Sequence, residues 1–252
     1  MRRFFALAAF VALALAAVPA SADITIKMSM ATSGGPMVME VTSTTLIKGM
    51  KMRTDTSVMG QDTSIIMDVT TKEQLKVDHA TKTVEDFNPS AAMAAMPISF
   101  GEPTVSIKPL TETKELLGRK CAGFTVQVTM PMELNGESVT MTMEGPVWIA
   151  KEGPGTAEYQ AFYKASAAAG LTGTAISAGP QSKGMAEMQK TFAANGIPLE
   201  QNLAMAVAGT GEVAQAMSQM GGNMSIVMKV SAITTDPTPD STFAIPAGYT
   251  KK

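Results

Sequence analysis

The chain is poor in the residues on which many catalytic and metal sites depend. Among its 252 residues it has one cysteine, Cys121, and one histidine, His79. A single cysteine forms no internal disulfide, so a large hydrophobic core must hold the fold. A serine or cysteine triad would have to use His79, because it is the only imidazole.

Catalytic motifs are also missing. The sequence has no His-Glu-x-x-His, no Cys-x-x-Cys, no phosphate-binding glycine loop with its lysine, no Gly-x-Ser-x-Gly and no Ser-x-x-Lys. His79 follows an alternating run and is predicted to be a solvated turn residue. Cys121 follows two cations that could lower the pKa of its thiol, but as a lone thiol it is predicted to be a packing residue. We therefore expect no enzymatic activity and no cofactor.

Only the N-terminus carries a long apolar run. Arg2 and Arg3 precede an apolar stretch from Phe4 to Val18, and Pro19 and Ala20-Ser21-Ala22 follow it. This is the pattern of a cleavable export signal over residues 1–22, and the run is short for a membrane anchor. Cleavage would expose Asp23. Because this residue is not a cysteine, the new N-terminus could not carry the acyl chains of a lipoprotein. We expect a periplasmic protein, with release to the exterior as the alternative, and no transmembrane segment in the mature chain.

Charge gives little indication of a partner. The 20 Lys and Arg fall to 18 without Arg2 and Arg3, against 22 Asp and Glu, which gives the mature chain a net charge of −4. This mild acidity provides no electrostatic reason to expect nucleic acid or an anionic membrane surface as partner.

Strict alternation of apolar and polar residues dominates the chain from Asp23 to about Lys151. Period two is typical of antiparallel strands with one buried face. Asn135-Gly136 predicts a tight hairpin, since both central residues of such a turn need positive φ. Gly34-Gly35-Pro36 and Gly60-Gln61-Asp62 predict further turns. The clearest apolar sets are Ile24, Ile26, Met28, Met30; Phe124, Val126, Val128, Met130, Met132; and Val139, Met141, Met143, Val147.

Composition shifts to Ala, Gly, Gln and Met between about residues 153 and 222. Two short helices are predicted there, at 157–169 and 184–195, to cover the apolar face of the sheet. Leu203, Met205 and Val207 alternate again, as do Met224 to Val230, and both runs fit strands. No repeat or domain boundary is evident, so residues 23–252 are expected to form one α+β domain with a helical insertion at about 153–222.

Methionine is unusually abundant, with 22 in the chain, often as Met-x-Met. Two residues apart on a strand share a face, so each pair presents two thioethers together. Such pairs suit copper(I). The methionines also fall on the same face as Ile, Val and Phe, which favours core packing or the lining of an apolar cavity. Methionine adapts to varied apolar partners, so a concave face of this kind would suit acyl chains.

Four segments carry a resemblance to a known family. They are Asp68–Val84, Leu117–Phe124, Val147–Ala150 with the residues that follow to Tyr163, and Asp240–Tyr249. Taken in order, they resemble a family of secreted bacterial proteins, domain of unknown function 4412, which is similar in architecture to the periplasmic lipoprotein carriers LolA and LolB. The resemblance implies a curved, mostly antiparallel sheet, an incomplete β barrel, with short helices on its concave face and an apolar cavity between.

The leading hypothesis is a non-enzymatic periplasmic binding protein for an apolar ligand, such as a lipid, a fatty acid or a lipoprotein acyl chain. Two alternatives stay open: a copper(I)-binding envelope protein using Met-x-Met pairs, and a purely structural envelope protein. No metal ligand set is predicted, and the sequence does not identify a protein partner. The residues expected to line the cavity are Met28, Met30, Met39, Phe124, Val128, Met130, Met141 and Met143.

Overall fold

The computed structural model describes residues 23–34, 39–87, 98–134, 136–171, 183–212, 214–216 and 224–252. The predicted export signal at 1–22 lies outside these ranges and stays a prediction. So do Asn135 and most of the predicted turn at Gly34-Gly35-Pro36.

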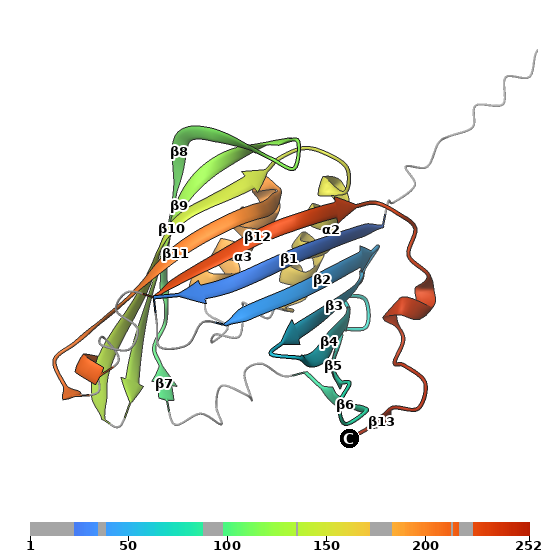
Figure 1. The fold of residues 1–252 in the computed structure, drawn as a ribbon, viewed down its shortest axis with the longest axis horizontal. Coiled ribbons are helices and arrows are strands. Elements are labelled where there is room, and N and C mark those ends of the chain that lie inside the picture. The colour runs from blue at the N-terminus through green and yellow to red at the C-terminus, as the bar shows by residue number, and fades with distance from the viewer. Residues whose placement is uncertain are drawn as a thin grey trace, which may run out of the picture.

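One open sheet of thirteen strands makes up most of the molecule (Figure 1). Its order is β13-β6-β5-β4-β3-β2-β1-β12-β11-β10-β9-β7, and β8 pairs with β9 beside β7. All pairings are antiparallel except that of β13 with β6. The strands are β1 (Ile24–Ser33), β2 (Glu40–Lys48), β3 (Lys51–Val58), β4 (Gln61–Asp68), β5 (Glu73–Asp78), β6 (Thr83–Asp86), β7 (Ile98–Phe100), β8 (Thr104–Leu116), β9 (Arg119–Leu134), β10 (Glu137–Ala150), β11 (Ile197–Gly209), β12 (Ser225–Thr234) and β13 (Thr250–Lys251).

Tight turns set the register of neighbouring strands. Leu134 pairs with Glu137, which confirms the hairpin predicted between β9 and β10, and Gly136 has a φ of 82°. The turn between β3 and β4 lies at Met59 and Gly60, one residue before the predicted place, and both residues have positive φ. Two positive φ values match the right-handed twist of the flanking strands.

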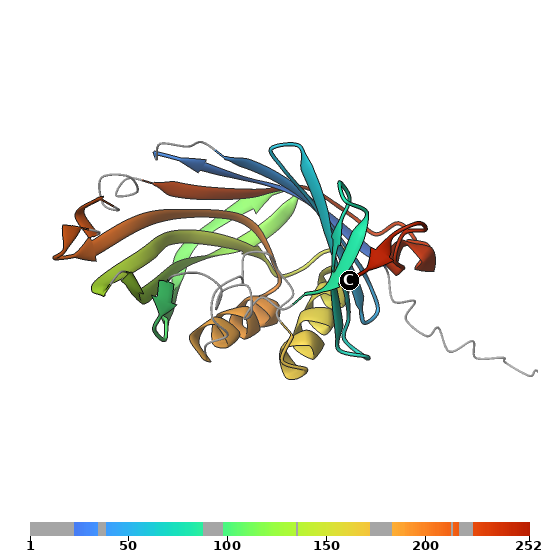
Figure 2. The ribbon, with the colours of Figure 1, turned by 90° about the horizontal axis from the view of Figure 1, so that it is seen from below.

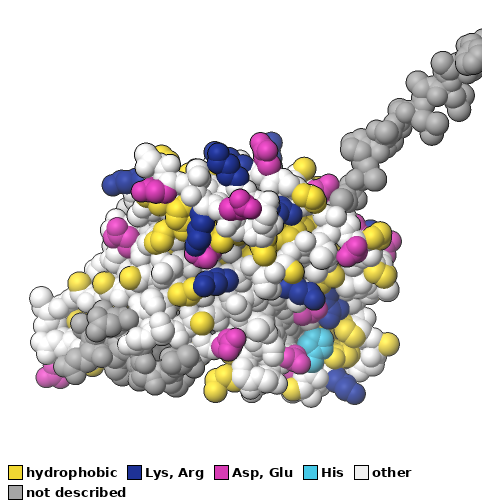
Figure 3. Space-filling view, turned by 45° about the horizontal axis from the view of Figure 1, so that its top comes forward, with side chains coloured by type: hydrophobic (Ala, Val, Ile, Leu, Met, Phe, Trp, Pro, Cys, Tyr) yellow, Lys and Arg dark blue, Asp and Glu magenta, His cyan; other side chains and the backbone are white. Residues whose placement is uncertain are grey.

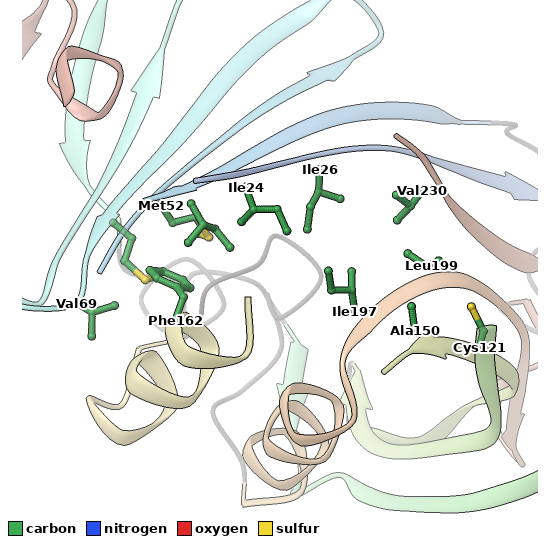
Figure 4. Close-up of a cluster of buried hydrophobic side chains, with 12 residues drawn as sticks. Ile24, Ile26, Met52, Val69, Cys121, Ala150, Phe162, Ile197, Leu199 and Val230 are labelled. Atoms are coloured by element: carbon green, nitrogen blue, oxygen red, sulfur yellow. The ribbon is translucent and has the colours of Figure 1, made fainter. Parts of the chain in front are cut away.

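Two helices lie on the concave side of the curved sheet (Figure 2). They are α2 (Thr156–Ala168) and α3 (Lys183–Asn195), within one residue of the predicted bounds, and they pack against each other. Phe162 of α2 belongs to a buried cluster with Ile24, Met52 and Leu199 (Figure 4). Met188 and Phe192 of α3 pack on a second cluster around Phe124 and Val147.

The α+β class and the incomplete, mostly antiparallel barrel with helices on its concave face are therefore confirmed. The segment expected as a helical insertion contains α2 and α3, but from Ile197 it continues as β11, a central strand between β10 and β12. The predicted strands around Leu203 and Val230 are confirmed as β11 and β12. A 3₁₀ turn, η2 (Asp240–Phe243), then lies in the C-terminal segment that leads to β13.

The C-terminal segment packs on the first strands of the sheet, on the face opposite to that on which the helices lie. Lys48 donates to the Thr238 carbonyl, and the Thr238 amide donates to Asp23 at 2.6 Å. Tyr249 packs against a cluster of Ile66, Leu75, Val77 and Val84 on that face. The edge of the sheet at β6 is thereby paired by β13.

Candidate functional site

Register places five of the predicted cavity residues together on β9 and β10. Met130 lies opposite Met141, and Val128 lies opposite Met143. Phe124 lies four residues before Val128 on β9, and it is opposite Val147 of β10. Directly opposed residues of an antiparallel pair share a face of the sheet. This is the concave face, because α3 packs on it.

The other three predicted residues lie beyond β11 and β12, on β1 and just before β2. Met28 and Met30 of β1 lie opposite Val230 and Met228 of β12. Met39 precedes β2, and its amide donates to the Thr32 hydroxyl at 3.0 Å. Met28 and Met30 thus lie on the same side of the sheet as the β9–β10 group, with β11 and β12 between, whereas Met39 lies outside the strands.

The strands between the two groups complete the apolar surface. Met205 of β11 lies opposite Met143, and Val207 lies opposite Met141. Ile226 of β12 lies opposite Leu203 of β11. The same alternation that revealed the predicted residues was visible in these runs, but one sequence does not show which strands are neighbours. We define the concave apolar face by its members: Met28, Met30, Phe124, Val126, Val128, Met130, Val139, Met141, Met143, Val147, Leu203, Met205, Val207, Ile226, Met228 and Val230.

No member of the concave apolar face carries a charge, although it extends over five strands. Beyond β1 the same side of the sheet also carries polar residues, and the buried hydroxyls of Thr45 on β2 and Thr54 on β3 are hydrogen-bonded to each other at 3.0 Å. Burial also raises the pKa of the α2 tyrosines Tyr159 and Tyr163 well above the usual range, so both hydroxyls stay neutral at physiological pH.

Packing covers part of this face and leaves part accessible. Phe124, Val128 and Met130 are buried in clusters beneath α3 and at the far end of the β9–β10 hairpin. The side chains of Met28, Met30, Met39, Met141 and Met143 are half-buried, as are those of Leu203, Met205, Val207 and Ile226. The concave apolar face therefore presents unbranched, adaptable side chains that retain contact with solvent.

His79 differs from its predicted state. It does follow β5 in a turn, but it is not simply solvated, since both ring nitrogens are bonded: Nε2 to the Ser64 hydroxyl at 2.6 Å and Nδ1 to the Tyr249 hydroxyl at 2.8 Å. Ser64 donates in turn to Asp55, which also accepts from Arg53. Sequence reasoning missed this because Ser64 and Tyr249 are distant in the chain.

The Ser64–His79 pair lacks the arrangement of a catalytic triad. In a triad a carboxylate orients the second ring nitrogen, whereas here a tyrosine hydroxyl occupies that position. Ser64 has no exposed surface from which to reach a substrate. The network instead attaches the C-terminal segment to β3, β4 and β5.

Cys121 is buried, as predicted. Burial raises the pKa of its thiol, and this outweighs the nearby cations Arg119 and Lys114. The thiol points into the core cluster (Figure 4), and Cys121 is a packing residue. Within the described residues, no group of three or more His, Cys, Asp and Glu side chains could hold a metal ion.

The geometry defines an open half-barrel with an uncharged, apolar concave face. No protein-family model matches the chain, so membership of domain of unknown function 4412 is not confirmed. No curated protein matches it either.

Two solved structures are similar to this chain over most of its length. One is a putative outer membrane lipoprotein-sorting protein domain from Vibrio parahaemolyticus, at 8% identity over 88% of this chain and 89% of that one, with a TM-score of 0.35. The other is a DUF1329 family protein from Desulfovibrio piger, at 10% identity over 90% and 91%, with a TM-score of 0.34. Similarity at this level carries no argument about function.

No helix in the described ranges has the length and hydropathy needed to cross a bilayer.

Proposed function

We propose that this protein is a non-enzymatic periplasmic carrier that holds an apolar ligand, a lipid, a fatty acid or a lipoprotein acyl chain, on its concave apolar face. The observation that carries the proposal is the charge-free surface across β1, β12, β11, β10 and β9, part of which stays only half-buried although two helices pack on the same side. A surface that served only as core would be expected to be fully covered.

The chemistry of the face fits an acyl chain. Each methylene transferred from water to an apolar site contributes about 0.8 kcal/mol. Methionine side chains are flexible enough to follow chains of different length and unsaturation. Helices α2 and α3 would act as the lid, since Phe162 and Phe192 already pack from the concave side. No reaction is required, because the ligand is held by burial alone.

Introducing charge on this face tests the proposal. Met130→Asp with Met141→Asp places two carboxylates opposite each other on the concave apolar face. The matched control is Thr129→Asp with Thr142→Asp. Thr129 and Thr142 also lie opposite each other, next to Met130 and Met141 in the two strands, but their side chains are on the other face of the sheet. Both doubles are incubated with a fluorescent fatty acid.

We expect the methionine double to lose fatty-acid binding at least tenfold and the threonine double to retain it. Circular dichroism verifies that each variant is folded. If the Met130→Asp substitution unfolds the protein, the test is repeated with Met143→Asp and Met205→Asp, since these two residues are half-buried and also lie opposite each other. Undiminished binding by a folded variant of either pair would refute the site.

Copper(I) binding is a second candidate, favoured by the pairing of methionines across strands. Met130 faces Met141, and Met143 faces Met205. Thioethers are soft ligands suited to copper(I). This function predicts copper uptake under reducing conditions and its loss when these four residues become leucine. The same leucine variant should keep its fatty-acid binding, so one protein separates the two candidates.

A further inference from the structure

A separate cavity of about 960 Å³ lies at one end of the sheet, apart from the concave apolar face. The β8–β9 hairpin forms one wall, the segment 151–154 before α2 forms another, and Ala232 and Ile233 near the end of β12 close it. None of the residues predicted to bind the apolar ligand lines it. Its volume is at the upper end of the range usual for small-molecule sites.

The charges around this cavity are mainly positive. Arg119, Lys120 and Lys151 line it together with one carboxylate, that of Glu152. Figure 3, in which the top of Figure 1 comes forward, shows Lys and Arg side chains among hydrophobic and acidic ones over this end of the sheet. The cavity thus differs from the surface as a whole, since the protein is slightly acidic.

Arg119 is half-buried whereas Lys120 and Lys151 are exposed, and it has no carboxylate partner within salt-bridge distance among the described residues. Its guanidinium donates only to neutral acceptors, the Pro154 carbonyl at 2.7 Å and the Thr156 hydroxyl at 3.3 Å. It packs so closely on Gly153 that a Cβ there would come within 2.9 Å of it. Partial burial lowers its pKa. A half-buried guanidinium without a counter-ion is a costly arrangement that an anionic ligand would relieve.

The remaining wall is apolar. Leu117, at the tip of the β8–β9 hairpin, is 47% exposed although it lines the cavity. Ala122 and Ile233 also line it, and both pack on core clusters. Cationic and apolar walls therefore face the same space.

We propose that this cavity binds an amphiphilic anion, a phosphate or carboxylate head with an apolar substituent. Arg119 holds the head through its free N–H groups, Lys120 and Lys151 add charge at the rim, and Leu117 and Ile233 contact the substituent. The guanidinium fork matches the oxygen geometry of both heads. This site is distinct from the concave apolar face and does not depend on the function proposed for that face.

Calorimetric titration with octyl phosphate tests the proposal, with inorganic phosphate and octanol as separate ligands. Arg119→Gln should weaken octyl phosphate binding at least tenfold. Lys108→Gln is the matched control, because Lys108 is an exposed β8 cation outside the cavity, and it should leave binding unchanged. Inorganic phosphate should bind at least tenfold more weakly than octyl phosphate. Octanol should not displace octyl phosphate. Nonanoate, which carries the octyl group on a carboxylate, should bind at the same site.

A second variant guards against misfolding of Arg119→Gln. Leu117 has a φ of 52°, a conformation that asparagine adopts readily, so Leu117→Asn should keep the turn while removing apolar surface. It should weaken octyl phosphate but not inorganic phosphate. Binding that is absent from the wild type, or equal in wild type and Arg119→Gln, overturns the proposal, as does equal affinity for octyl and inorganic phosphate. The Met130/Met141 aspartate double should bind octyl phosphate normally, which separates this site from the carrier face.

Discussion

Met130 of β9 lies directly opposite Met141 of β10, on the concave side of the sheet, and β11 and β12 separate this pair from Met30 of β1 on the same face. This relationship follows from period two: the neighbours of both residues, Thr129 and Pro131 on β9 and Thr140 and Thr142 on β10, face the other side. A shift of register by one residue would turn the whole methionine set to the outer face. The β9–β10 hairpin therefore determines where the proposed ligand is held.

Met52 and Met59 provide a matched test of the core. Met52 on β3 has no exposed surface and packs with Ile24 and Phe162, whereas Met59 in the following turn is 81% exposed. Met52→Ala should lower the free energy of unfolding by about 2–5 kcal/mol, since it loses burial and leaves a cavity. Met59→Ala should change it by less than about 0.5 kcal/mol. Urea unfolding measures both, and equal effects would mean that Met52 is not in a packed core.

Gly196 is expected to be indispensable at the junction of α3 and β11. It has a φ of 122°, and a Cβ there would lie 2.0 Å from the Ala150 carbonyl oxygen. Gly60 also has positive φ, at 81°, but a Cβ there meets nothing within 4 Å. Gly60→Ala should cost about 1–2 kcal/mol from backbone strain alone. Gly196→Ala should cost well over that, and thermal unfolding that ranks the two equally would exclude the close approach.

Tyr249 should anchor the C-terminal segment through His79. Tyr249→Phe removes the hydroxyl bonded to His79 Nδ1 and leaves that nitrogen without its partner. The expected loss is about 1 kcal/mol of stability. Amide exchange should accelerate at Thr250 and Lys252, whose amides bond to β6 and the turn before it. Unchanged exchange there would show that the segment is held independently of His79.

Acid should weaken the contact between the C-terminal segment and β2. The hydrogen bond and charge of Lys48, 2.8 Å away, lower the pKa of Asp240 below its ordinary value of 3.8. A pKa that is lower in the folded state stabilises the fold above the unfolded value, and this contribution is lost as pH falls through the folded pKa. Between about pH 5 and pH 1, the wild type should lose more stability than Asp240→Asn. Parallel pH curves for the two proteins would contradict the pairing.

The sequence predicted which face of a strand each residue occupies better than it predicted which strands are neighbours in the sheet. Alternation alone placed Met28, Phe124 and Met141 on apolar faces, because period two is a local property of each strand. It did not show that β12 and β11 lie between β1 and β10, since those pairings join residues about 200 and 60 positions apart.

Polar contacts were predicted least well for the same reason. His79 depends on Ser64, 15 residues away, and on Tyr249, 170 residues away. Arg119 lies two residues before Cys121 in sequence, yet the cavity around it exists only because the segment before α2 folds back over the β8–β9 hairpin.

Native mass spectrometry of the protein purified from the envelope of its own host tests the carrier function most directly, followed by denaturing extraction of whatever is bound. We predict a lipid or fatty acid at near-stoichiometric level in the wild type and in the Thr129/Thr142 aspartate double, and its loss from the folded Met130/Met141 aspartate double. A ligand-free mass for the wild type that persists after incubation with palmitate would contradict the account.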